Sequence, residues 1–213
     1  YGQAPVSYLL QNDGKGHFTD VTAQVAPELM TAGFVTQAVW TDLDKDGDQD
    51  LVLALEWGAV TAYINQQGIF TRKELTTQKG WWNSLTVADV NGDGYPDLLA
   101  GNLGLNSRLK ASIEQPVRLY YYDFDHNGRK EQVLTYYLQN KEIPFANKAE
   151  LEKQIPLLKK KFLYAADFAK ASLQDLFGSK ELENAGKWSA DYFSSAVLIN
   201  KGNLQFSVES LPF

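Results

Sequence analysis

Three short acidic loops with one shared pattern constrain this chain more than any other feature of its sequence. They begin at Asp42, Asp89 and Asp123, and each carries Asp, Asn or Glu at positions 1, 3, 5 and 9 with Gly at position 6. Alternate side chains of a tight loop converge on one point, and Ca²⁺ accepts six to eight oxygen ligands in flexible geometry. One such loop is also typical of an ordinary Asx turn, but three in one chain predict calcium sites.

The loops belong to a larger repeat. The first two begin 47 residues apart (89 − 42), and apolar segments typical of buried strands follow them at 51–55 and 98–101. Apolar strands with an Asn/Gly turn and a returning aromatic residue, a pattern typical of hairpins, recur at 8–18, 62–70 and 197–206. A strand, an acidic loop and a strand, followed by a hairpin, make a four-stranded unit of about 45–50 residues, which is the size of a propeller blade.

The predicted fold class is therefore all-β. It is a partial β-propeller of about three to four four-stranded antiparallel blades, fewer than most closed propellers need. We expect one propeller segment over residues 1–213, with blade repeats at 1–146 and 185–213 and a helical insert at 147–184. Open blade edges would allow self-association or pairing with further sequence.

The insert is predicted from capping and spacing. Asn147 with Glu150 fits a capping box, Ser172 can cap a second helix ending at Gly178, and Pro156 implies a break. Between them, apolar residues recur at helical spacing: Leu151, Ile155, Leu158 and Phe162. The insert is interpreted as a packed surface decoration, with a partner-binding element as the alternative.

The third acidic loop departs from the repeat. It begins only 34 residues after the second (123 − 89) and is flanked by strand-like segments at 117–122 and 132–137. By position, it is expected to replace the Asn/Gly hairpin of its blade, with 101–116 as a loop insertion.

Composition narrows the function class. The 213 residues are 44% hydrophobic, which is enough apolar material for a core. The net charge is −6, whereas a surface that binds nucleic acid would be basic. There are no cysteines, and no apolar run is long enough to span a membrane. The chain begins at Tyr1 without a signal peptide, which favours a mature product or a piece of a longer chain.

At these motifs the chain resembles the FG-GAP/VCBS repeat family, the integrin α-like calcium-binding propeller repeats, in their bacterial envelope form. Residues 42–50 and 89–97, each followed by an apolar strand, resemble the family's calcium loop, and residues 12–22 resemble its hairpin. The resemblance covers residues 6–137 and 188–211. It implies a propeller fold and structural calcium, but it says little about biological role.

The resemblance also implies a ligand set, with side chains at positions 1, 3, 5 and 9 and a backbone carbonyl at position 7. Two to three Ca²⁺ ions would be bound by Asp42, Asp44, Asp46, Asp48 and Asp50; by Asp89, Asn91, Asp93, Tyr95 and Asp97; and by Asp123, Asp125, Asn127, Arg129 and Glu131. Asp48, Tyr95 and Arg129 would contribute their carbonyls. An EF-hand is disfavoured, because position 12 holds Leu53, Ala100 and Leu134 instead of a bidentate glutamate.

No catalytic constellation is found. The two histidines, His17 and His126, both fall in expected turns, and the five tryptophans are interpreted as filling between blades, with a sugar-stacking face as the alternative. We therefore expect a non-enzymatic module of a secreted, cell-surface or periplasmic protein that binds a protein or glycan. The alternative is an accessory or catalytic part of an envelope carbohydrate-active enzyme.

Overall fold

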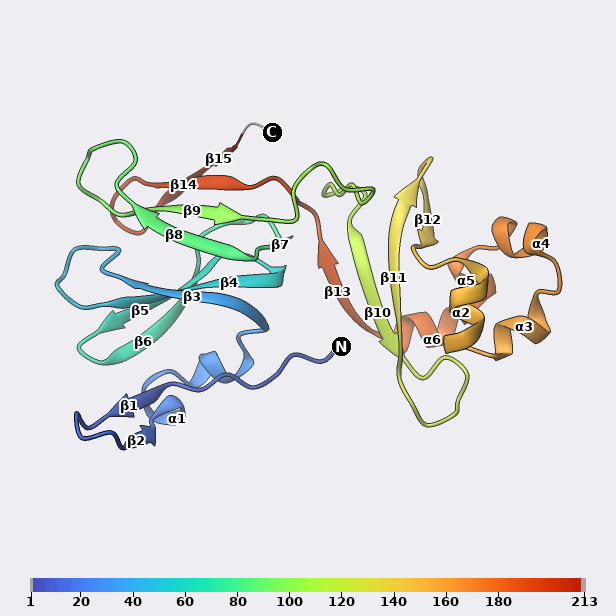
Figure 1. Ribbon diagram of the computed structural model, residues 1–213, viewed down its shortest axis with the longest axis horizontal. Coiled ribbons are helices and arrows are strands. Elements are labelled where there is room, and N and C mark those ends of the chain that lie inside the picture. The colour runs from blue at the N-terminus through green and yellow to red at the C-terminus, as the bar shows by residue number, and fades with distance from the viewer. Residues whose placement is uncertain (1, 212–213) are drawn as a thin grey trace. The chain divides into compact units, whose positions relative to one another are not determined.

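The computed structural model describes residues 2–211 (Figure 1). It is mostly β, with four antiparallel sheets of two to five strands, none of which is closed. The chain divides into two compact units. We call residues 4–107 and 192–211 the repeat unit, and residues 2–3 and 108–191 the insert unit. The predicted all-β, partial propeller-like fold with a helical insertion is confirmed, whereas the prediction of one propeller segment over the whole chain stays a prediction.

The first complete blade lies in the repeat unit. Its strands follow one another in the sheet in chain order: β3 (Phe34–Thr41), β4 (Asp50–Gly58), β5 (Thr61–Gln66) and β6 (Ile69–Glu74). The short β7 (Gly80–Trp81) also pairs with β4. Residues 51–55 of β4 are buried, as a continuous apolar run predicts for an internal strand. The acidic loop at 42–50 joins β3 to β4, and the predicted hairpin joins β5 to β6.

The second blade is assembled from distant parts of the chain. Its sheet has the order β15-β14-β9-β8, in which β8 (Ser84–Ala88) and β9 (Asp97–Gly101) flank the second acidic loop. Its hairpin, β14 (Ala196–Asn200) and β15 (Phe206–Ser210), begins 95 positions after β9 ends (196 − 101). The prediction that the third acidic loop replaces this hairpin is therefore wrong. The hairpin at 197–206 completes this blade because Val197 and Leu198 pair with Leu99 and Leu98.

A third hairpin precedes these blades. β1 (Leu10–Asn12) and β2 (Phe18–Asp20) form a two-stranded sheet, and α1 (Thr22–Val25) and the 3-10 helix η1 (Pro27–Thr31) follow it. Every residue of both strands is exposed.

The core of the repeat unit is shared by both complete blades. Trp82, Leu98 and Leu198 are fully buried together with Val52 and Ala62 of the first blade. Tyr192 packs at its border, with its ring 5.8 Å from that of Trp82. Residues on both sides of the insert unit in sequence therefore stabilise one core.

This shared core predicts that Leu198→Ala will destabilise the repeat unit although the residue lies near the end of the chain. Truncating a fully buried leucine removes apolar burial and leaves a cavity, so we expect a loss of about 2–5 kcal/mol in the free energy of unfolding. Denaturant unfolding measures it. Ile69→Ala in β6, where the side chain is 54% exposed, is the control. Equal effects of the two variants would contradict the assignment of the second hairpin to this core.

The insert unit has a sheet of order β12-β11-β10-β13. Its strands are β10 (Val117–Tyr122), β11 (Glu131–Leu138), β12 (Lys141–Pro144) and β13 (Gly186–Ala190), and the third acidic loop joins β10 to β11. Five short helices lie between β12 and β13: α2 (Lys148–Gln154), α3 (Leu157–Lys161), α4 (Ala165–Lys170), α5 (Leu173–Phe177) and α6 (Ser179–Asn184). Figure 1 shows them together beside this sheet.

Local sequence signals position these helices as predicted. Asn147 with Glu150, and Ser172 with Asp175, form complete capping boxes, and Pro156 separates α2 from α3. The predicted helical-spacing residues Leu151, Ile155 and Leu158 are buried against Phe124 and Val133 of the β10–β11 hairpin, and Phe162 packs at the border of the same cluster. The helices thus supply one side of the insert unit's core.

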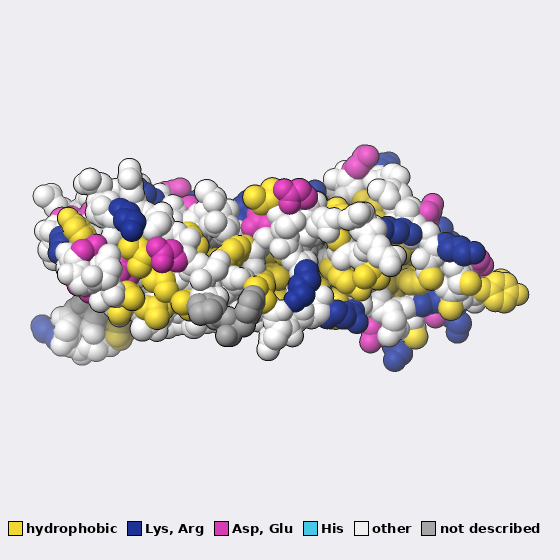
Figure 2. All heavy atoms as spheres, turned by 90° about the horizontal axis from the view of Figure 1, so that it is seen from above, with side chains coloured by type: hydrophobic (Ala, Val, Ile, Leu, Met, Phe, Trp, Pro, Cys, Tyr) yellow, Lys and Arg dark blue, Asp and Glu magenta, His cyan; other side chains and the backbone are white. Residues whose placement is uncertain are grey.

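Within the described residues, no helix combines the length and apolar character needed to cross a bilayer. On the face shown in Figure 2, basic and acidic side chains are interspersed. The expectation that nucleic acid is not a partner stays a prediction.

Candidate metal centres in the acidic loops

The three loops share one hydrogen-bonded framework. In each, the carboxylate at position 9 accepts the backbone N–H of position 2, with distances of 2.8 Å (Leu43 to Asp50), 2.9 Å (Val90 to Asp97) and 2.8 Å (Phe124 to Glu131). This bond joins the start of the loop to the strand that follows it. Asp50 and Asp97 are fully buried and Glu131 is 5% exposed, so the anchoring carboxylates lie beneath the loops.

The carboxylate at position 1 organises the loop from the other side. Asp42 accepts the N–H groups of Asp46 (3.2 Å) and Gly47 (3.0 Å). Asp89 and Asp123 accept from the same two positions of their loops at 2.8–3.1 Å. The position 5 side chain then accepts the N–H of position 7 at 2.8 Å in all three loops.

Positive φ angles explain why glycine stands at position 6 of each loop and show that His126 belongs to a turn. Position 6 has φ of 97°, 85° and 86° in Gly47, Gly94 and Gly128, a region that glycine adopts without steric cost. Position 4 is also left-handed in all three loops, with φ of 64° at Lys45, 75° at Gly92 and 58° at His126. His126 is therefore part of the loop's turn, as the sequence predicts, and its Nε2 lies 3.6 Å from a carboxylate oxygen of Glu181.

Carboxylates converge in two of the loops. In the first, one oxygen from each of Asp42, Asp44 and Asp50 lies within 4.8 Å of the others, and Asp123, Asp125 and Glu131 converge in the same way in the third. Asp125 Oδ1 is buried and has no hydrogen-bond partner among the described residues. A buried acceptor without a donor is costly, and a cation among three carboxylates would satisfy it. The chemistry and clustering of these oxygens fit a hard divalent cation.

The second loop is built with one fewer carboxylate than the first. Asn91 stands at position 3, where it accepts the Asp93 N–H through its oxygen (2.9 Å) and donates from Nδ2 to the Asp93 carboxylate (2.8 Å). Lys45 of the first loop lies with its Nζ 4.3 Å from the centre of the Tyr95 ring. The second loop is therefore less crowded with negative charge than the first.

The pKa values of the loop carboxylates also shift in different directions in the different loops. Burial raises the pKa of Asp44, with the nearby Asp46 and Asp42 charges adding to it. Burial also raises the pKa of Asp50, against the two N–H groups that it accepts. Burial and the charges of Asp125 and Asp123 raise the pKa of Glu131. In the second loop, hydrogen bonds from the Tyr95 N–H and the Asn91 side chain instead lower the pKa of Asp93. The first and third loops thus disfavour their own negative charge unless a cation offsets it.

Two asparagines that the sequence analysis did not select tie the loops to the hairpins. The second oxygen of Asp50 accepts the Asn65 N–H, and that of Asp97 accepts the Asn200 N–H, both at 2.8 Å. Asn65 Nδ2 also donates to the Gln49 carbonyl (3.1 Å), and Asn200 Nδ2 donates to the Leu43 carbonyl of the first loop (2.9 Å). The signal in the sequence was the recurrent Asn at the end of each apolar hairpin strand.

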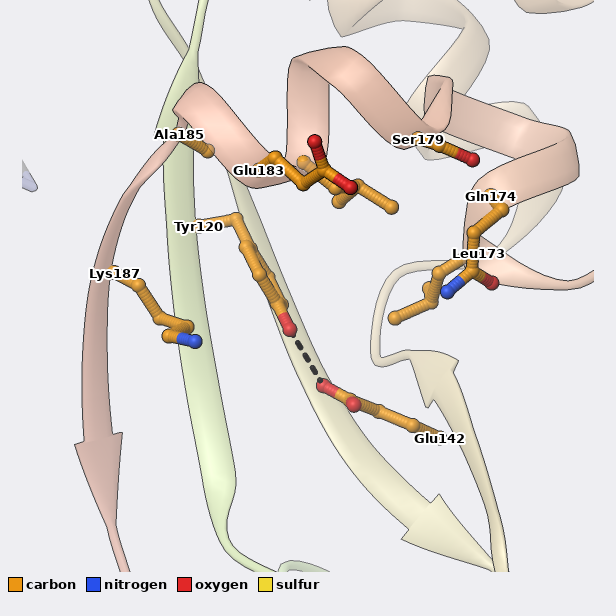
Figure 3. A pocket seen from close by; sticks show the side chains of 9 residues that line it. Tyr120, Glu142, Leu173, Gln174, Ser179, Glu183, Ala185 and Lys187 are labelled. Atoms are coloured by element: carbon orange, nitrogen blue, oxygen red, sulfur yellow. Dashed lines mark hydrogen bonds between the residues drawn. The ribbon is translucent and has the colours of Figure 1, made fainter.

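A polar pocket of about 520 Å³ lies in the insert unit, between its sheet and helices α5 and α6 (Figure 3). On the sheet side, Glu142 accepts hydrogen bonds from Arg118 (2.6 Å), Thr135 (2.6 Å) and Tyr120 (3.4 Å). Burial, followed by the Glu142 charge, raises the pKa of Tyr120 to about 12, so its hydroxyl stays a donor at neutral pH.

The other polar side chains of this pocket lie around it on α5, α6 and β13. They are Gln174, Ser179, Glu183 and Lys187. Among residues 2–211, Glu183 and Lys187 make no ion pair with each other or with a third residue. The pocket therefore presents an organised polar floor and a rim with both charge signs.

Comparison with known proteins bears on the loops directly. The family model of the FG-GAP-like repeat matches residues 42–100, which run from the start of the first acidic loop to the strand after the second. Searches of curated proteins and of solved structures found no match. The matched segment is well under half of the chain and contains ten of the predicted ligand positions. Residues 42–100 thus match an FG-GAP-like repeat, as their acidic loops and following strands predicted.

Proposed function

We propose that this chain is a calcium-binding β-propeller repeat module whose calcium is structural. The observation that carries the proposal is the convergence of three carboxylates in each of two loops, with Asp125 Oδ1 buried and without a donor among residues 2–211. The match to an FG-GAP-like repeat supports it. The ligands would be the fifteen residues named from the sequence, with Asp48, Tyr95 and Arg129 contributing carbonyl oxygens.

The loops act as corners between strands. Bound calcium would supply positive charge that offsets the repulsion among the carboxylates. The loop's own hydrogen bonds position the backbone around the ion. The position 1 carboxylate accepts the N–H groups of positions 5 and 6, and the position 9 carboxylate accepts that of position 2. In the first two loops, position 9 also holds the neighbouring hairpin through Asn65 and Asn200. Ion binding would therefore stabilise whole blades, and its free energy would add to folding.

Calorimetric titration of chelator-stripped protein tests the loop assignments. We expect two to three calcium ions per chain, with the tightest site in the first loop, which has four ligand carboxylates against three in each of the others. Asp44→Asn should weaken or abolish one binding event, since it removes one converging carboxylate. Asp167→Asn, an exposed aspartate on α4, is the control with the same charge change. The proposal fails if the wild-type protein takes up no calcium.

The location that we propose is extracellular, at the cell surface or in the periplasm. FG-GAP-like repeats are typical of extracellular and surface proteins. Extracellular calcium is abundant enough to fill such loops, whereas cytosolic calcium generally is not.

The biological role that we propose is binding of a protein or glycan, and the pocket in the insert unit favours a glycan. It offers both donors and acceptors next to the apolar side chains of Leu173 and Leu182, a combination suited to a polyhydroxylated ligand. Glu183 and Lys187 can contact such a ligand without breaking an ion pair to any residue that the structure describes.

A saccharide panel screened by NMR tests this role. We expect a saccharide that binds wild-type protein to bind about tenfold more weakly to Glu183→Gln or Lys187→Ala, since each removes a polar contact. The exposed Glu209→Gln in the repeat unit should leave binding unchanged. Turnover of a bound saccharide would instead favour the second candidate, part of a carbohydrate-active enzyme. Its weakness is that Glu142 is already held by Arg118. A panel with neither binding nor turnover would contradict both.

A further inference from the structure

The hairpin of β1 and β2 is the counterpart of the hairpins in the two complete blades. In all three, an asparagine on the first strand pairs with a phenylalanine on the second: Asn12 with Phe18, Asn65 with Phe70, and Asn200 with Phe206. In all three, the asparagine Oδ1 accepts the N–H of a turn glycine, at 2.9 Å (Gly14), 2.8 Å (Gly68) and 3.0 Å (Gly202). The three hairpins can therefore be compared residue by residue.

In the complete blades, the first hairpin strand is covered along its second edge, because the strand that follows an acidic loop pairs with it there. β4 pairs with β5, and β9 pairs with β14. Each pairing places the position 9 aspartate against the asparagine N–H, at 2.8 Å in both blades. It also places the apolar residue at position 10 opposite the residue two before the asparagine, as in Leu51 with Tyr63 and Leu98 with Leu198.

β1 has no such covering strand among residues 2–211, where its sheet contains β2 alone (Figure 1). The N–H groups of Leu9 and Asp13 are directed toward the β2 side, where they donate to Thr22 Oγ1 (2.7 Å) and the His17 carbonyl (3.1 Å). Alternation along a strand therefore directs the N–H groups of Leu10 and Asn12 to the opposite, open edge. Asn65 and Asn200 direct the same group to an aspartate.

The exposure of the side chains also indicates that β1 lacks a covering strand, independently of the hydrogen bonds. Leu10 stands two residues before Asn12, and its side chain is 53% exposed. Its counterparts, Tyr63 and Leu198, are both 0% exposed. The neighbouring Tyr8 and Phe18 are exposed by 61% and 62%. Within the described part of the chain, β1 thus presents an unpaired edge and an exposed apolar surface at the place where both other hairpins are covered.

We propose that the open edge of β1 binds a strand that follows an acidic calcium loop, supplied by a polypeptide segment outside these 213 residues. The segment places an aspartate against the Asn12 N–H and an apolar residue opposite Leu10, and thereby completes a blade. A second copy of this chain cannot supply it in its folded form, because β4, β9 and β11 already pair on both edges. The inference rests on the proposed role of the chain as a propeller repeat module.

The test uses a synthetic peptide with the sequence of residues 84–101, which contains a strand, an acidic loop and the strand after it. In calcium-containing buffer, we expect the labelled peptide to bind the intact protein saturably, as measured by fluorescence anisotropy. Binding should be at least about tenfold weaker to Leu10→Lys, which places a charge under the added strand. The same loss is expected when the peptide carries Asp97→Asn.

The matched control is Leu138→Lys in β11 of the insert unit, where a leucine has the same exposure, 53%. Since both substitutions are at exposed positions, both variants should keep the wild-type melting temperature, and only Leu10→Lys should lose the peptide. Absence of peptide binding, or equal binding by both variants, would overturn the inference. A dimer in sedimentation experiments that Leu10→Lys abolishes would also overturn it in favour of self-association. Calcium uptake by the protein itself is measured separately, so failure here leaves the calcium assignment standing.

Discussion

Removal of calcium with a chelator is expected to lower the thermal unfolding midpoint of the repeat unit by roughly 16–22 °C. A ligand at about 100 times its dissociation constant stabilises the folded state by about 2.7 kcal/mol per site, and the repeat unit has two loops. For a unit of this size, each kcal/mol shifts the midpoint by about 3–4 °C. Differential scanning calorimetry with calcium and with chelator measures the shift.

Magnesium in place of calcium is the control for this experiment. Because magnesium requires near-ideal octahedral geometry and dehydrates reluctantly, it should restore only a small part of the lost midpoint. A melt that is unchanged by chelator would mean that the backbone hydrogen bonds of the loops suffice to hold the blades. That result would contradict the proposal that calcium has a structural role in these loops.

Asp97→Asn is expected to destabilise the repeat unit by about 3 kcal/mol more than Asp93→Asn, a substitution in the same loop with the same loss of charge. The buried Asp97 carboxylate accepts the N–H groups of Val90 and Asn200, one on each side of it. An asparagine retains one acceptor oxygen and turns an N–H group toward the other donor. Asp93 is exposed and accepts from Tyr95 within the loop, so its replacement disturbs less.

Denaturant unfolding of both variants in saturating calcium separates the two roles of the loop. Both substitutions should reduce calcium affinity, whereas only Asp97→Asn should release the hairpin at 196–210. Hydrogen exchange at the Asn200 amide reports that release. Equal destabilisation by the two variants would mean that the position 9 carboxylate acts only through the metal.

Local features were predictable because short stretches of sequence determine them. The turn at each loop follows from glycine at position 6, and helices α2 and α5 follow from Asn147 with Glu150 and Ser172 with Asp175. The hairpins follow from apolar strands that end in Asn and Gly turns. Each of these signals acts within about ten residues, a range over which backbone sterics and side-chain capping dominate.

Strand partners were not predictable in the same way. The sequence alone determined that acidic loops, hairpins and a helical insert exist. Its motifs also predicted the match to the FG-GAP-like repeat. Only the tertiary structure decided that β14 pairs with β9 across the insert unit, and that Asn200 joins the first acidic loop to the second. Many apolar strands could pair equally well by pattern, and the choice depends on which buried side chains pack together and which buried N–H groups find an acceptor. Those conditions exist only once distant segments meet.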